Sequence, residues 1–159
     1  MATEKIDSYT GSRADILACI PASSMTILDV GCSNGALGEA LRNQVPKRQV
    51  MGIEYDHAFC AEARTRLNAV IQGDLNTFSW LDHYEKETFD CLIFADILEH
   101  LYDPWLVLRE SIKLLAPGGL VVISIPNIRH ISSLFAIFVK GSFPRQNRGI
   151  FDRTHVRNR

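Results

Sequence analysis

A glycine-rich turn between an apolar run and an amphipathic segment constrains the fold of this sequence more than any other feature. The residues D-V-G-C-S-N-G-A-L-G occupy positions 29–38 and directly follow the apolar run 25–28. Glycines in such a turn let the backbone approach a ligand closely, and the helix that starts there leaves free N–H groups at its first residues. The pattern therefore predicts a strand, a turn and a helix that together form a nucleotide-binding site.

Helical and strand-like patterns alternate along the rest of the chain. Helices are expected over 12–20, 35–45, 58–67 and 104–115, with a weaker helical turn at 78–84, and strands over 26–30, 50–54, 69–72, 89–95 and 120–125. Because the strands are short and mostly apolar and alternate with helices, the sequence predicts a doubly wound α/β fold, with a mostly parallel sheet covered on both faces. In such a sheet the ligand lies beyond the carboxyl ends of the strands, next to the first strand.

Length, charge and cysteine content limit the class of protein. The chain has 159 residues, 47% of them hydrophobic, which is enough for a single domain with one sizeable core. A formal net charge of −1 provides no overall field to recruit nucleic acid. The four cysteines form no C-x-x-C pair, and neither a signal-peptide pattern nor a transmembrane apolar stretch is present. These features favour a cytoplasmic protein that binds no nucleic acid.

Glu54 is the first candidate binding residue outside the glycine turn. It ends the second predicted strand, 19 positions after Gly35, where an acid in nucleotide-binding folds accepts hydrogen bonds from a ribose. An ordinary solvated acid at a strand end is the alternative. The turn has Ser33 at its third position, so it departs from the G-x-G-x-x-G pattern of dinucleotide sites. These residues alone leave the identity of the ligand open.

Five motifs occur in a fixed order along the chain. They are D-V-G-C-S-N-G at 29–35, G-I-E-Y-D at 52–56, Q-G-D-L at 72–75, F-D-C-L-I-F-A-D-I-L-E-H-L at 89–101 and L-L-A-P-G-G at 114–119. Together they resemble the motifs of class I S-adenosylmethionine-dependent methyltransferases, in particular the type 11 and type 12 methyltransferase domains. The resemblance implies a Rossmann-like sheet with strand order 3-2-1-4-5, in which the last two strands of the family's sheet are missing or truncated here.

The resemblance also implies a cofactor, S-adenosylmethionine, which leaves as S-adenosylhomocysteine. The residues expected to hold it are Asp29, Gly31, Cys32, Ser33, Asn34, Gly35, Glu54, Tyr55, Asp74, Leu75, Ala95 and Asp96. Among them, Glu54 would bind the ribose hydroxyls and Asp74 the adenine amino group. Tyr9 and Arg13 would close over the methionine end of the cofactor, and a surface role beside the first helix is the alternative for both.

Candidate catalytic residues follow the fourth predicted strand. Methyl transfer needs aligned reactants, and it needs a base only where the acceptor must lose a proton. Asp96 and His100 lie in the D-I-L-E-H segment, and His100 is favoured because an imidazole titrates near neutral pH. A packing or capping role is the alternative. His155 is a third candidate, since G-I-F-D-R-T-H-V-R at 149–157 resembles an acceptor-side stretch in methyltransferases of bacterial polysaccharide and metabolite pathways.

A divalent metal is an alternative that these residue types leave open. Asp96, Glu99 and His100, completed by His130 or His155, could hold one, and small-RNA 2′-O-methyltransferases have a similar acidic and histidine set. We favour a site without metal.

The domain organisation and the acceptor are predicted as follows. Residues 1–24 carry an N-terminal helix, 25–126 form the cofactor-binding core, and 127–159 form an incomplete acceptor-side or lid segment. The favoured acceptor is a sugar or other hydroxylated small molecule, free or lipid-linked, that is methylated on oxygen. The alternatives are a catalytically incomplete cofactor-binding domain or partner subunit, and an NAD-dependent oxidoreductase. A homodimer would cover the open edge of a five-stranded sheet.

Overall fold

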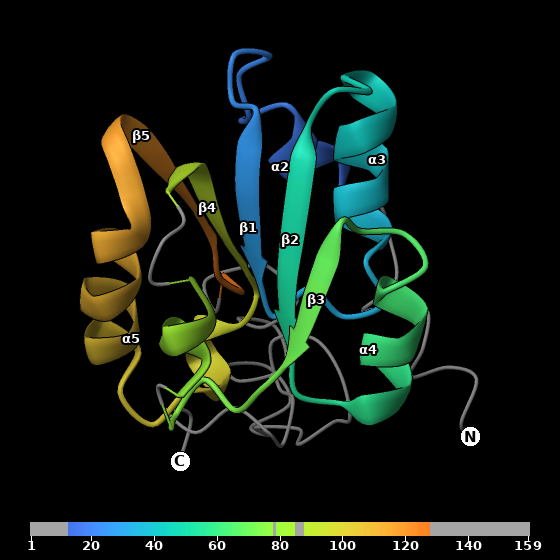
Figure 1. Cartoon of the computed structure of the whole chain (residues 1–159). Helices are drawn as coiled ribbons and strands as arrows, with labels where there is room; N and C mark the ends of the chain where they lie inside the picture. The colour runs from blue at the N-terminus through green and yellow to red at the C-terminus, as the bar shows by residue number, and fades with distance from the viewer. Residues whose placement is uncertain (1–12, 78, 85–87, 128–159) are drawn as a thin grey trace, which may run out of the picture.

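One parallel sheet organises the molecule. The computed structural model describes residues 13–77, 79–84 and 88–127, and within these ranges five strands pair in the order β3-β2-β1-β4-β5 (Figure 1). The strands are β1 (Thr26–Val30), β2 (Gln49–Glu54), β3 (Ala69–Gln72), β4 (Phe89–Ala95) and β5 (Leu115–Ser124). Every neighbouring pair is parallel. The predicted fold class and strand order are confirmed.

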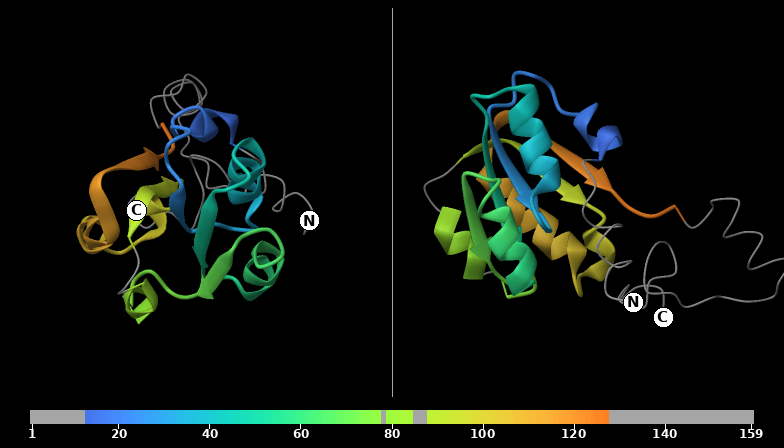
Figure 2. Two further views of the ribbon diagram at one scale, coloured as in Figure 1. Left: turned by 45° about the horizontal axis from the view of Figure 1, so that its top comes forward. Right: turned by 90° about the vertical axis from the view of Figure 1, so that its right-hand side faces the viewer.

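Helices cover both faces of the sheet. The α-helices are α2 (Ala14–Leu17), α3 (Ala36–Gln44), α4 (His57–Ala63) and α5 (Pro104–Ser111), and three 3-10 helices join them: η1 (Ser79–Tyr84), η2 (Leu98–His100) and η3 (Ile112–Leu114). Helices α2, α3 and α4 lie on one side of the sheet and α5 lies on the other (Figure 2). No helix within the described ranges has both the length and the apolar character needed to cross a lipid bilayer.

The sheet separates two hydrophobic cores. Along β4, Cys91 and Ile93 face the core shared with α2, α3 and α4, whereas Leu92 and Phe94 face the core shared with η1, η2 and α5. All four side chains are fully buried. This alternation follows from the two-residue period of a strand, and burial on both faces explains why the strand sequence is an almost unbroken apolar run.

The start of β5 differs from the sequence prediction. The predicted helix 104–115 ends as an α-helix at Ser111 and continues as η3, and β5 begins at Leu115 instead of residue 120. Its register advances five positions, from Leu115 to Leu120, while β4 advances two, from Phe89 to Cys91. The P-G-G segment 117–119 is therefore a bulge inside the strand. Gly118, with φ +81°, supplies the left-handed backbone that this bulge requires.

Two helices are also shorter than predicted. The prediction of a helix over 12–20 is wrong in extent, because α2 has four residues and Arg13 before it is left-handed, with φ 47°. Helix α4 ends at Ala63 instead of residue 67. The chain after it makes tight turns, in which the Thr65 and Arg66 amides donate to the carbonyl groups three residues earlier. In both stretches the apolar residues keep helical spacing. Such spacing predicts which side chains are buried, but it does not predict the residue at which the helix ends.

Arg48 is a charged residue inside the core. It is 1% exposed, and its guanidinium donates to the carbonyl oxygens of Pro21 (2.7 Å), Ser24 (3.0 Å) and Leu41 (3.2 Å). Leu41 belongs to the last turns of α3, and the other two acceptors belong to the loop that precedes β1. The arginine therefore joins this loop to the carboxyl-terminal part of α3.

Arg48→Met should destabilise the fold by about 2 kcal/mol, because it leaves buried carbonyl groups without donors. Urea unfolding measures the loss. The exposed neighbour provides the control, and Lys47→Met should unfold at the wild-type urea concentration. Equal midpoints for the two variants would show that the carbonyl contacts of Arg48 do not stabilise the loop.

Candidate functional site

The glycine turn lies where the carboxyl end of β1 meets β2. The amides of Gly31 and Cys32 both donate to the carbonyl oxygen of Ile53, at 2.9 and 3.0 Å. Gly31 has φ +79°, and a Cβ atom built on it would lie 2.7 Å from Cγ1 of Ile97. Only glycine fits between these neighbours. The turn is thus fixed against β2 on one side and against the loop after β4 on the other.

Glu54 is oriented by the loops after β1 and β2. Its Oε2 accepts from the Ser33 amide at 2.8 Å, and its Oε1 accepts from the Asp56 amide at 2.8 Å. Both carboxylate oxygens thus accept a backbone hydrogen bond and keep a further lone pair each. The carboxylate stands beside the glycine turn in a defined orientation, which is a suitable arrangement for accepting hydrogen bonds from a diol.

Asp29 is a buried acid beside the same turn. It is 2% exposed, and none of the described residues forms a salt bridge with its carboxylate. Burial, and then the negative charge of Glu54, raise the pKa of Asp29 to about 7. Burial also raises the pKa of the neighbouring Cys32 thiol well above its usual range. The buried Asp29 carboxyl therefore lies close to the turn, and ionising it is costly in the absence of a cation.

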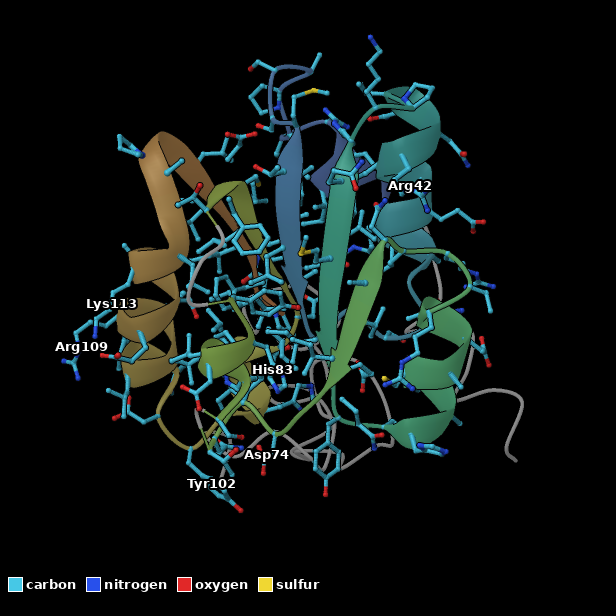
Figure 3. The ribbon with its side chains drawn as sticks, viewed as in Figure 1. Arg42, Asp74, His83, Tyr102, Arg109 and Lys113 are labelled. Carbon is cyan, nitrogen blue, oxygen red and sulfur yellow. The ribbon has the colours of Figure 1, made fainter. Side chains whose placement is uncertain are left out.

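Asp74 is held by the loop that follows β3. Its Oδ1 accepts from the amide and the side-chain nitrogen of Asn76, both at 2.9 Å. Oδ1 of Asn76 accepts in turn from the Tyr102 amide at 3.0 Å, so the loops after β3 and η2 are joined. Figure 3 shows Asp74 and Tyr102 close together at the end of the molecule where the strands have their carboxyl ends. Leu75, in the same loop, is buried, whereas Tyr55 and Tyr102 are exposed.

Arg13 and Asp96 form an ion pair over the ends of β4 and β5. Nη1 of Arg13 lies 2.5 Å from Oδ2 of Asp96, and the hydroxyl of Ser124 donates to the other carboxylate oxygen at 2.6 Å. Arg13 also donates to Ser124 Oγ and to both carboxylate oxygens of Asp15. Asp96 has a left-handed backbone with φ 52°. Sequence reasoning placed Arg13 and Asp96 near the cofactor separately and missed both their pairing and Ser124.

The candidate bases lie in different parts of the chain. His100 ends η2, four positions after Asp96, and its amide donates to the Ile97 carbonyl at 3.0 Å. Tyr9, His130, His155 and almost all of the predicted acceptor segment 127–159 lie outside the described residues. Among the described residues, no three His, Cys, Asp or Glu side chains are grouped to hold a metal ion. Asp96, Glu99 and His100 therefore do not form such a set by themselves.

Comparison with protein families gives a match over most of the chain. The model of the family described as "Methionine biosynthesis protein MetW" matches residues 12–151. The matched region includes the glycine turn, Glu54, Asp74 and the loop after β4.

Curated relatives are similar over part of their length. A ubiquinone biosynthesis O-methyltransferase of Hydrogenovibrio crunogenus is 34% identical over 116 residues, which cover 71% of this chain and 47% of that protein. The mitochondrial enzyme of the same name from Candida albicans is 31% identical over 139 residues, which cover 85% and 42% of the two chains. The chain thus spans about half the length of these relatives.

Solved structures share the fold. The plantazolicin methyltransferase BpumL, in complex with a triazolic desmethylPZN analog and SAH, superposes with a TM-score of 0.67 at 18% identity, over 84% of this chain and 56% of that one. An amino pentose methyltransferase from Micromonospora echinaspora, bound to SAM, superposes with a TM-score of 0.56 at 27% identity, over 77% and 50% of the two chains. The fold is that of class I methyltransferases.

Proposed function

Because the chain belongs to the MetW family and has the class I methyltransferase fold, we propose that it binds S-adenosylmethionine and transfers the methyl group to an oxygen of a hydroxylated small molecule. The observation that carries this proposal is the pair of acids at the glycine turn, Asp29 and the amide-oriented Glu54. A diphosphate at this position would meet negative charge, whereas an adenosyl ligand with a cationic sulfonium centre would be attracted.

Each part of the adenosyl ligand has a candidate partner in the described chain. The Glu54 carboxylate would accept from the ribose hydroxyls. The two hydrogen bonds that Asn76 donates to the Asp74 carboxylate both use Oδ1, so Oδ2 would accept from the adenine amino group. Arg13 and Asp96 carry opposite charges side by side, which suits the carboxylate and ammonium groups of the methionine end.

The reaction requires little chemistry from the side chains. When bound, S-adenosylmethionine supplies a methyl group activated by a sulfonium sulfur. The glycine turn and the acids orient the donor, and the loops after β4 and β5 position the acceptor. His100 or His155 would take the proton from the acceptor hydroxyl, with Asp96 orienting the region through its bonds to Arg13 and Ser124.

The class of acceptor is proposed from the relatives. The two curated relatives described above are named O-methyltransferases, and one structural neighbour is named an amino pentose methyltransferase. The first name favours a hydroxylated metabolite as acceptor, and the second favours a sugar. A second candidate function is that of a cofactor-binding partner subunit without turnover of its own.

Calorimetric titration tests the donor, and turnover tests the reaction. We expect S-adenosylmethionine and S-adenosylhomocysteine to bind and NAD not to bind. Binding of NAD alone would refute the proposal and indicate an oxidoreductase. Methyl transfer to one of a panel of hydroxylated acceptors would establish the enzyme, whereas normal cofactor affinity without any turnover would favour the partner subunit.

Arg13→Ala should lower the affinity for S-adenosylhomocysteine about tenfold, because a charge-assisted contact to the ligand carboxylate is lost. It should leave the affinity for 5′-methylthioadenosine unchanged, since that ligand lacks the amino-acid part. Arg109→Ala is the control, because Arg109 is exposed on α5 (Figure 3). An equal loss of both ligands would mean that Arg13 acts through the fold and not through the methionine end.

A further inference from the structure

Ser33 has a backbone conformation that disfavours its side chain. Its φ is 49°, a left-handed value that L-residues other than glycine adopt at a cost in free energy. The other non-glycine residues with positive φ in the described part of the chain are Arg13 and Asp96, which form the ion pair over β4 and β5. Such strain collects at ligand sites, where the surrounding structure maintains it. The presence of a serine instead of a glycine at position 33 therefore needs a physical explanation.

The hydroxyl group of Ser33 adds a second cost. Its Oγ atom is buried and has no hydrogen-bond partner among the described residues. Buried polar groups in folded proteins are nearly always paired, and an exception is expected where a ligand or a water molecule supplies the partner. A glycine at this position would avoid both the strained φ and the unpaired hydroxyl.

The position of Ser33 indicates where its partner would arrive. The Ser33 amide donates to Oε2 of Glu54 at 2.8 Å, and covalent geometry keeps the serine Oγ within ~4 Å of that amide nitrogen. The hydroxyl is thus a close neighbour of the Glu54 carboxylate. In the dinucleotide fingerprint, the second glycine stands at this place so that the backbone can approach a diphosphate. Here a hydroxyl occupies that position instead.

We propose that Ser33 is a specificity-determining residue whose hydroxyl bonds to a ribose hydroxyl of the adenosyl ligand, alongside Glu54. The inference rests on the proposed function and deepens it, because it assigns a second ribose contact to the turn. In the absence of ligand, the protein bears the cost of the strained backbone and the unpaired hydroxyl. The ribose then supplies the missing partner.

Two substitutions separate the hydroxyl from the backbone strain. Ser33→Ala removes the hydroxyl and keeps a Cβ atom at positive φ, whereas Ser33→Gly removes both. We expect Ser33→Ala to lower the affinity for S-adenosylhomocysteine and for 5′-methylthioadenosine equally, by about five- to tenfold, because both ligands carry the ribose. Without ligand, its Tm should rise by about 2–4 °C, and that of Ser33→Gly should rise further. Ser23→Ala, at an exposed serine, should change neither quantity.

Three results would overturn the inference. Unchanged affinities of Ser33→Ala with a raised Tm would mean that the hydroxyl is an unpaired buried group that makes no contact with the ligand. A lower affinity of Ser33→Ala for S-adenosylhomocysteine alone would place the contact of the Ser33 hydroxyl at the methionine end of the ligand. If the wild-type protein binds neither ligand, the proposed function fails together with the inference, whereas wild-type binding with either of the first two results leaves the proposed function intact.

Discussion

Replacing Gly31 by valine should abolish cofactor binding and lower the free energy of unfolding by about 3–5 kcal/mol. Two causes combine. The φ of +79° is strongly unfavourable for a β-branched residue, and the new Cβ atom would lie 2.7 and 2.9 Å from two carbon atoms of the Ile97 side chain. The turn must move to relieve the contact, and the Ser33 amide that orients Glu54 would move with it. Urea unfolding and titration with S-adenosylhomocysteine measure the two effects.

Gly118 provides a matched control for this substitution. It has nearly the same backbone conformation, with φ +81°, but no atom lies within 4 Å of the position of its Cβ. Gly118→Val therefore carries the backbone strain without the steric contact, and it should retain wild-type affinity for S-adenosylhomocysteine. If the two valine variants lose the same stability, the contact with Ile97 is not the cause. A second check is the pair Gly31→Ala and Gly31→Ala/Ile97→Ala, in which the smaller neighbour should restore cofactor affinity in part.

The sheet could be predicted because its pattern is local. Each central strand is a short apolar run buried on both faces, and helices separate successive strands, so the local pattern predicts a parallel sheet. The strand order 3-2-1-4-5 came from the resemblance of the motifs to those of class I methyltransferases, and it is confirmed. The glycine turn could be predicted for the same reason. The bulge in β5 could not, because P-G-G is equally typical of a turn that ends an element. Only pairing with β4 shows that these residues lie inside the strand.

Contacts between distant residues could not be predicted. Arg13 and Asp96 are 83 positions apart, and Ser33 and Glu54 are 21 apart, so no local spacing indicates either hydrogen bond. Arg48 follows a proline and a lysine and has the sequence context of a solvated loop, yet it is buried and bonded to three carbonyl groups. Sequence reasoning identified residue types suited to the site. The orientation of each carboxylate depends on backbone amides and cations that only the fold brings close.

The buried carboxyl of Asp29 makes stability depend on pH. Its pKa is raised from 3.8 to about 7, so the folded protein binds more protons than the unfolded chain between these values. The associated stability is fully present below about pH 4 and is lost as the pH rises through 7. Asp29→Asn cannot ionise and should escape this loss. At 1.36 kcal/mol for each pH unit, its advantage over the wild type should approach ~4 kcal/mol above pH 7 and vanish near pH 4.

Asp90 is a control of opposite sign. Amide hydrogen bonds from Thr26 and Met25 lower the pKa of its carboxyl. Its contribution to stability is therefore present above the ordinary aspartate pKa and is lost as the pH falls. Asp90→Asn should be less stable than the wild type at pH 7, with a deficit that shrinks toward acidic pH. Urea unfolding at several pH values from about 2 to 8 would measure both variants, because the Asp90 deficit shrinks only below the ordinary aspartate pKa of about 4.

The same carboxyl should make cofactor binding depend on pH in the opposite direction. A cationic ligand requires the ionised form of Asp29, which is a minor species at pH 6 and the major one at pH 8. Affinity for S-adenosylmethionine should therefore rise about tenfold between these values, because the apparent Kd scales with the inverse of the competent fraction. Asp29→Asn should bind about 100-fold more weakly at pH 8 and show no such rise. A variant that is more stable at pH 8 and still binds with wild-type affinity would show that Asp29 is not a cofactor residue. The acid would then be a buried group retained for a reason unrelated to the ligand.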